Sequence, residues 1–194
     1  MANPVKGDKM LATFVFVAML GGTMTPLEMM VRRNVVVETN ESRCSGVILS
    51  TGIVLSVFHA IEIDSDIKVN GKEAKIVLIR PDLDMIVLRT TTDKLPDVVF
   101  GINIGIATPV ISVGNPLNMD GLVSRGFVLF KEDKHIYLDI IAMPGFSGGG
   151  IYTENGELIG LAQKMRGAKS GGSWMAQALR SERIIEALEK LEKK

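Results

Sequence analysis

Apolar residues in this sequence recur in short β-branched runs, which are separated by clusters of Asn, Asp, Ser, Gly and Pro. In the first half the runs cover residues 35–37, 46–49, 53–57, 67–69, 75–78 and 85–88. In the second half they cover residues 105–107, 110–114, 126–129, 136–138, 150–152 and 158–161. Short strands at this spacing predict an all-β sandwich or barrel in each half.

The boundaries between these regions are also visible in the pattern. A polar stretch with a proline, residues 90–96, separates a first unit of about 34–95 from a second of about 104–180. Within the first unit, Asn70-Gly71 is a strong hairpin signal. A capping-box spacing at Thr25 predicts a short helix, and apolar positions spaced as on one helix face predict a C-terminal helix at 181–192.

The N-terminal residues 1–24 form a separate apolar segment. Lys6 and Lys9 precede an apolar run at 10–20, and no charge occurs from residue 10 to residue 27. A positive flank before such a run is typical of an export signal or a membrane anchor. We therefore expect membrane contact through residues 10–27 and favour an exported or anchored protein over a cytoplasmic one. The alternative is a buried strand or helix that packs on the domain.

Composition narrows the classes of function. The 194 residues contain 22 Lys plus Arg and 22 Asp plus Glu, so zero net charge gives no electrostatic reason to expect a nucleic-acid partner. The single cysteine, Cys44, forms no intrachain disulfide, and with only two histidines we expect neither a metal site nor a cofactor.

Candidate chemistry lies in residues 143–150 (MPGFSGGG). Ser147 stands among glycines, which adopt the tight turns that point successive backbone N–H groups at one spot. A serine needs a base to become a nucleophile. His59, at the end of the apolar run 53–58, is the best candidate for that base.

Several blocks around these residues resemble trypsin-like serine proteases, and the HtrA-like branch in particular. The blocks are 44–48 (CSGVI), 55–61 (LSVFHAI), 84–88 (DMIVL), 110–116 (VISVGNP), 144–149 (PGFSGG) and 155–160 (NGELIG). Their order, His then Asp then Ser, is that of chymotrypsin. The resemblance covers about residues 35–191 and implies two six-stranded antiparallel β-barrels with a C-terminal α-helix. No sequence remains after that helix for a PDZ module, so none is expected.

The resemblance also implies roles for individual residues. Ser147 would be the nucleophile, His59 the general base and then acid, and Asp84 the carboxylate that orients the imidazole. Asp82 competes with Asp84 for this third role, and the alignment of the block favours Asp84. The backbone N–H groups of Gly145 and Ser147 would form the oxyanion hole.

The implied function is a serine endopeptidase that acts on polypeptides through an acyl-enzyme. Its substrate pocket would be formed by five residues, which are Ile141, Ala142, Leu161, Ala162 and Gln163. Their apolar character predicts a preference for small or medium aliphatic residues before the cleaved bond. The oligomeric state is left unassigned.

Two alternatives stay open. Phe146 stands where the family usually has Asp or Asn. This departure keeps open an inactive protease fold that serves in binding or as a structural component. Another hypothesis is self-processing, in which the enzyme cuts its own apolar N-terminus.

Overall fold

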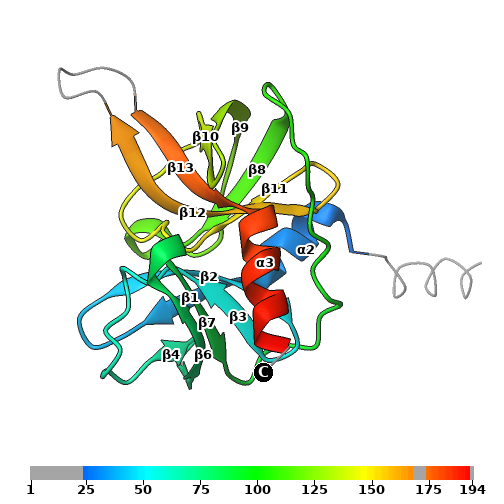
Figure 1. Cartoon of the computed structure of the whole chain (residues 1–194). Helices are drawn as coiled ribbons and strands as arrows, with labels where there is room; N and C mark the ends of the chain where they lie inside the picture. Colours follow the sequence, from blue (N-terminus) through cyan, green and yellow to red (C-terminus); the bar gives the residue numbers. More distant parts are fainter. Residues whose placement is uncertain (1–23, 168–173, 193–194) are drawn as a thin grey trace, which may run out of the picture.

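The fold consists of two β-sheets that lie against each other, with helices at their junction (Figure 1). The computed structural model describes residues 24–167 and 174–192, so the apolar N-terminal segment 1–24 lies outside the described residues except for its last residue. Strands dominate the described chain and a helix ends it. The expected all-β class with a C-terminal helix is confirmed.

The first sheet has seven strands in the order β5-β4-β1-β2-β3-β7-β6. They are β1 (Asn34–Glu38), β2 (Arg43–Ser50), β3 (Ile53–Ser56), β4 (Lys68–Val69), β5 (Lys72–Glu73), β6 (Lys75–Arg80) and β7 (Met85–Arg89). Its edge strands, β5 and β6, are separated in the chain only by Ala74. The sheet therefore curls so that its two edges meet at one bent strand, formed by β5 and β6 together. When β5 and β6 are counted as one strand, the sheet has the six strands expected for the first barrel.

The hairpin between β4 and β5 turns at Asn70 and Gly71. These residues have φ of 47° and 75°, and Val69 pairs with Lys72 on either side of them. Positive φ at both central residues is the two-residue turn that suits the twist of a hairpin, and Asn-Gly is its preferred sequence. The prediction at this site is confirmed.

The second sheet closes into a six-stranded barrel in the order β10-β13-β12-β11-β8-β9. The strands are β8 (Pro109–Gly114), β9 (Leu122–Lys131), β10 (His135–Leu138), β11 (Gly150–Tyr152), β12 (Leu158–Gly167) and β13 (Trp174–Arg180). All neighbours in this barrel are antiparallel.

One expected strand of the second barrel is wrong, and a different one takes its place. Residues 105–107 are not a strand: residues 106 and 107 form a turn, and Ala107 has a φ of 63°, a value outside the β region. The sixth strand is β13, which pairs with β10 and β12. Its sequence, WMAQALR, contains no β-branched residue and is an example of tertiary pairing that overrides local propensity.

Two helices lie against the sheets, and two single 3-10 turns, η1 (Pro81–Leu83) and η2 (Pro116–Asn118), connect strands. Helix α2 (Pro26–Arg33) begins with the expected capping box between Thr25 and Glu28. Helix α3 (Ser181–Glu192) contacts β12 and β13, and it buries Ile184 and Ala187. Neither of these two helices, the only α-helices in the described ranges, is long and apolar enough to cross a membrane.

Buried apolar side chains form two clusters. One fills the second barrel, and the larger one extends from the first sheet across the junction to residues of the second, including Leu161 and Leu179. The buried contact between the sheets therefore fixes how residues of the two halves lie relative to each other.

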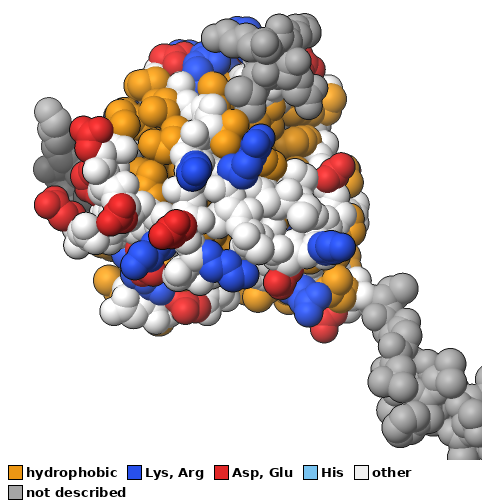
Figure 2. Space-filling model, turned by 90° about the horizontal axis from the view of Figure 1, so that it is seen from below, with side chains coloured by type: hydrophobic (Ala, Val, Ile, Leu, Met, Phe, Trp, Pro, Cys, Tyr) orange, Lys and Arg blue, Asp and Glu red, His pale blue; other side chains and the backbone are white. Residues whose placement is uncertain are grey.

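On the face shown in Figure 2, basic and acidic side chains are mixed, and apolar side chains gather toward its edges.

Candidate active site

His59 and Asp84 meet because their strands are neighbours. Ser56 at the end of β3 lies beside Ile86 near the start of β7, so the residues just beyond these strand ends come together. The Nδ1 atom of His59 lies 2.8 Å from Oδ2 of Asp84, and the backbone N–H of His59 donates to Oδ1 at 2.9 Å. With Nδ1–H as the donor, Nε2 of the neutral ring is left as the proton acceptor.

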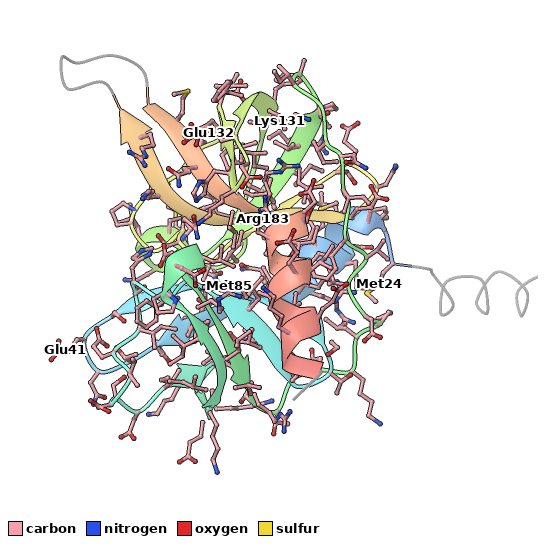
Figure 3. The ribbon with its side chains drawn as sticks, viewed as in Figure 1. Met24, Glu41, Met85, Lys131, Glu132 and Arg183 are labelled. Carbon is pink, nitrogen blue, oxygen red and sulfur yellow. The ribbon has the colours of Figure 1, made fainter. Side chains whose placement is uncertain are left out.

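Asp84 has an unusual backbone conformation. It follows η1 with φ of 50° and ψ of 49°, in the left-handed region, and its N–H donates to the Pro81 carbonyl at 3.1 Å. Asp82 turns away and accepts two hydrogen bonds from Arg80, at 2.9 and 2.7 Å, and these bonds hold the pKa of Asp82 below its usual value. Of the two candidate carboxylates, Asp84 is therefore the one that contacts the imidazole. Figure 3 labels Met85, the residue that follows it, near the junction of the two sheets.

Ser147 lies on a loop that is held from both sheets. The Ser45 N–H in β2 donates to the Ser147 carbonyl at 2.8 Å, and the Gly148 N–H donates to the Ala162 carbonyl in β12 at 2.7 Å. Gly148 has a φ of 86°, and a Cβ atom there would lie 1.9 Å from the Ser45 carbonyl oxygen. Only glycine therefore fits directly after Ser147.

Just before Ser147 the chain makes a type II β-turn. The Phe146 N–H donates to the Met143 carbonyl at 2.9 Å, Pro144 occupies the second position and Gly145 has a φ of 91° at the third. The Leu117 N–H holds the Pro144 carbonyl at 3.2 Å. Because C=O and N–H point in opposite directions in a trans peptide, the Gly145 N–H faces away from Leu117.

The backbone N–H groups of Gly145 and Ser147 are not used within the described part of the fold. Neither one donates a hydrogen bond to another atom of residues 24–167 and 174–192. Phe146, between them, is only 1% exposed, and its ring lies against Gly114. The residue that departs from the family pattern is thus a buried anchor of this loop.

The Ser147 hydroxyl donates to the backbone carbonyl of Gln163 at 2.9 Å. Among the described residues no hydrogen bond joins it to His59, although both side chains line the same cavity. Serine Oγ moves between three staggered positions by rotation about χ1. The arrangement thus places a rotatable hydroxyl and an imidazole on one cavity.

This cavity has a volume of about 290 Å³ and mostly apolar walls. Besides His59 and Ser147 it is lined by Ala142, Met143, Pro144, Phe146, Ala162, Gln163, Lys164, Met165, Ala176 and Gln177. No group of three His, Cys, Asp or Glu side chains that could hold a metal ion occurs in the described ranges.

Three of the five expected pocket residues, Ala142, Ala162 and Gln163, line the cavity. Leu161 is absent from the lining. Successive strand side chains point to opposite faces, and Leu161 is fully buried in the cluster between the sheets. Ile141 is also absent from the lining, and it is 55% exposed at the surface.

Sequence reasoning missed three supporting interactions. The Ser45 hydroxyl donates to the Gly145 carbonyl at 2.8 Å, and the Asn115 N–H donates to the Ser45 oxygen at 2.8 Å. The Gln163 amide nitrogen donates to the Leu83 carbonyl at 2.6 Å. Each interaction joins residues 70 or more positions apart, so the local sequence pattern carried no signal for them.

Comparison with known proteins shows which family this chain resembles. The family model of the trypsin-like peptidase domain matches residues 44–161, which is more than half of the chain. A Chlamydia trachomatis protein named "Probable periplasmic serine endoprotease DegP-like" is 28% identical over 166 residues, covering 75% of this chain and 33% of its own length. A Halomonas elongata protein of the same name is 29% identical over 151 residues, covering 70% of this chain and 32% of its own. The chain thus spans about a third of these relatives.

Solved structures show the same fold. The serine endoprotease from Yersinia pestis superposes with a TM-score of 0.74 at 27% identity, covering 89% of this chain and 69% of that one. An inactive mutant form of Rv3671c from M. tuberculosis superposes with a TM-score of 0.72 at 16% identity, covering 100% and 97%, and this likeness concerns the fold alone. From the match to the family model and the agreement in fold, the chain belongs to the trypsin-like peptidase domain family.

Proposed function

We propose that this protein is a serine endopeptidase. The observation that carries the proposal is the pair of hydrogen bonds from His59 to Asp84 beside the cavity that Ser147 shares. Relatives named as serine endoproteases and the family match support it.

In the proposed reaction the Ser147 hydroxyl leaves the Gln163 carbonyl and turns toward His59. His59 Nε2 takes the proton while Oγ attacks the carbonyl carbon of the substrate peptide bond, and Asp84 stabilises the imidazolium that forms. The Gly145 and Ser147 N–H groups bind the negatively charged oxygen of the tetrahedral intermediate. Imidazolium then protonates the leaving amine, the C–N bond breaks, and water activated by His59 hydrolyses the remaining ester.

The substrate class follows from the cavity walls. Apolar side chains such as Met143, Met165 and Ala176 line the cavity beside Ser147. We propose polypeptides with a small or medium aliphatic residue before the cleaved bond. Because relatives are named as periplasmic, we also propose that the protein is exported.

A second candidate function is peptide binding without cleavage. The resting hydrogen bond from Ser147 to Gln163, in place of one to His59, favours this alternative. One experiment distinguishes the two functions. A fluorophosphonate probe should label the purified full chain, and Ser147→Ala should abolish the labelling.

The control is Ser112→Ala, which removes a buried hydroxyl in the second barrel outside the site. It should label like the unmodified chain. Absence of labelling in chain whose circular dichroism and cooperative unfolding are normal would contradict the peptidase and favour the binding protein.

A further inference from the structure

Gln163 occupies an irregular position in the second barrel. Ala162 pairs with Ala178 and Lys164 pairs with Gln177, so Gln163 is the extra residue of a bulge between β12 and β13. A bulge bends its strand and redirects the side chain of the extra residue. The Gln163 side chain is only 2% exposed, so it is directed into the protein.

The redirected side chain crosses from the second barrel to the first sheet. Its Nε2 atom donates to the carbonyl oxygen of Leu83 at 2.6 Å and to that of Asp84 at 3.2 Å. Both amide hydrogens therefore bind the segment that carries the carboxylate of the candidate site. The sequence analysis placed Gln163 only in the substrate pocket, and this contact gives its side chain another role.

The contact matters because of the conformation of Asp84. A residue other than glycine in the left-handed region costs free energy and persists where its surroundings hold it. In this conformation both oxygens of Asp84 reach His59, one the backbone N–H and one the ring. The two amide hydrogens of Gln163 lie where they can hold it.

We propose that Gln163 is a positioning residue, which holds the Leu83–Asp84 main chain so that the Asp84 carboxylate fixes the His59 ring. The proposal deepens the proposed peptidase function and rests on it. The backbone carbonyl of Gln163 also accepts the resting hydrogen bond of Ser147. One buried residue thus contacts both sides of the site, across the junction of the sheets.

The first test is kinetic and uses the full chain with a peptide substrate. Gln163→Met keeps the approximate length and volume of the side chain but has no donor. We expect kcat to fall about 10- to 100-fold with little change in KM, because small misplacement of a reacting group has effects of this size. Asp82→Asn, on the same segment but bound to Arg80, is the matched control and should keep full activity.

A double-mutant cycle separates positioning from general damage. If Gln163 acts through Asp84, then Gln163→Met should cause no further loss in an Asp84→Ala background. An equal loss in both backgrounds, or full activity of Gln163→Met alone, would overturn the proposal. Should Gln163→Met fail to fold, Gln163→Asn, which keeps the amide but is one methylene too short, provides the same comparison.

A second readout does not depend on activity. In a Ser147→Ala background, the NMR signal of the His59 ring N–H that donates to Asp84 should exchange faster with water when Gln163 is methionine. With Asp82→Asn it should stay protected. Unchanged protection with methionine would refute the positioning role even if the chain proves not to be a peptidase. If Gln163→Met loses the protection of this N–H, and the unmodified chain does not react with fluorophosphonate, the positioning role of Gln163 is supported. Only the proposed peptidase function is then contradicted.

Discussion

Ser45 in the first sheet donates its hydroxyl hydrogen to the carbonyl oxygen of Gly145, which lies 100 residues later in the chain, at a distance of 2.8 Å. The Ser45 side chain is fully buried, and its oxygen accepts the N–H of Asn115 in turn. The type II turn that presents the Gly145 N–H is therefore held by Ser45 of the first sheet, whose hydroxyl is itself held by the Asn115 N–H of the second half.

Ser45→Ala should lower activity through this turn. Without the hydroxyl the Gly145 carbonyl loses its donor, so the turn is freer to flip. We expect kcat to fall about 10-fold, less than on loss of an oxyanion-hole donor itself, with KM nearly unchanged. Steady-state kinetics with a peptide substrate measures this. Ser112→Ala, another buried serine, is the control, and an equal loss of kcat in both variants would contradict the relay.

Gly148→Ala should prevent native folding of the Ser147 loop. The new methyl group would collide with the Ser45 carbonyl, in addition to the strain of a φ of 86°. Gly71→Ala is a matched control, because Gly71 has a φ of 75° but open space around it. Urea unfolding should show a loss of about 1 kcal/mol for Gly71→Ala and more than about 3 kcal/mol for Gly148→Ala. Equal losses would mean that the loop moves to relieve the collision.

Arg33→Met should destabilise the fold although it removes no ion pair of Arg33 among the described residues. The buried Arg33 guanidinium donates to the carbonyl oxygens of Ile48, Pro96 and Asp97 at 3.0, 2.7 and 3.2 Å. Loss of these donors should cost about 3 kcal/mol of the free energy of unfolding. Arg125→Met, which breaks an exposed pair with Glu154, should cost less than about 1 kcal/mol in the same denaturation experiment. A similar cost for both variants would refute the difference.

Cys44 should make stability depend on alkaline pH. Burial raises the pKa of its thiol from an ordinary value of 9.0 to about 11. Between these values the unfolded chain loses the proton and the folded chain keeps it, so the free energy of unfolding falls as pH rises through this window, by on the order of 2 kcal/mol. Urea titrations at pH 8, 9, 10 and 11 measure the slope.

The control for this pH dependence is Cys44→Ala. In this variant the tyrosines still contribute to the change of stability with pH, but the thiol is absent. The variant should show a smaller fall between pH 9 and pH 11, whatever its stability at pH 8. In the unmodified chain, iodoacetamide should react with the thiol only after denaturation. Rapid reaction in the folded state, or an equal slope in Cys44→Ala, would contradict the effect of burial.

The parts of the site that sequence predicted are those that a local pattern can carry. His59 follows an apolar strand, Asp84 precedes another, and Ser147 stands among glycines, so each had a signal in its own neighbours. The alignment of the block favoured Asp84 over Asp82, but the sequence held no physical reason for that choice. Only the pairing of Arg80 with Asp82 shows why Asp84 is free to reach His59.

The parts that sequence missed depend on pairing between distant strands. β13 forms because β10 and β12 offer it hydrogen-bonding partners, while none of its own residues is β-branched. The resemblance implies a pocket position for Leu161, whereas its side chain is buried between the sheets. The bulge at Gln163 had no signature in the neighbouring residues either.

The candidate dyad and the candidate nucleophile belong to different sheets. His59 and Asp84 both extend from the first sheet, whereas Ser147 lies on the second barrel. A sliding movement between the halves would therefore separate the Ser147 hydroxyl from the His59 imidazole. The imidazole would keep its contact with the Asp84 carboxylate. Residues such as Leu161 and Leu179, buried at the junction, oppose that movement. A mild denaturant that weakens the contact between the halves should therefore abolish turnover before either half unfolds. The loss of activity then reports how firmly the two halves are joined.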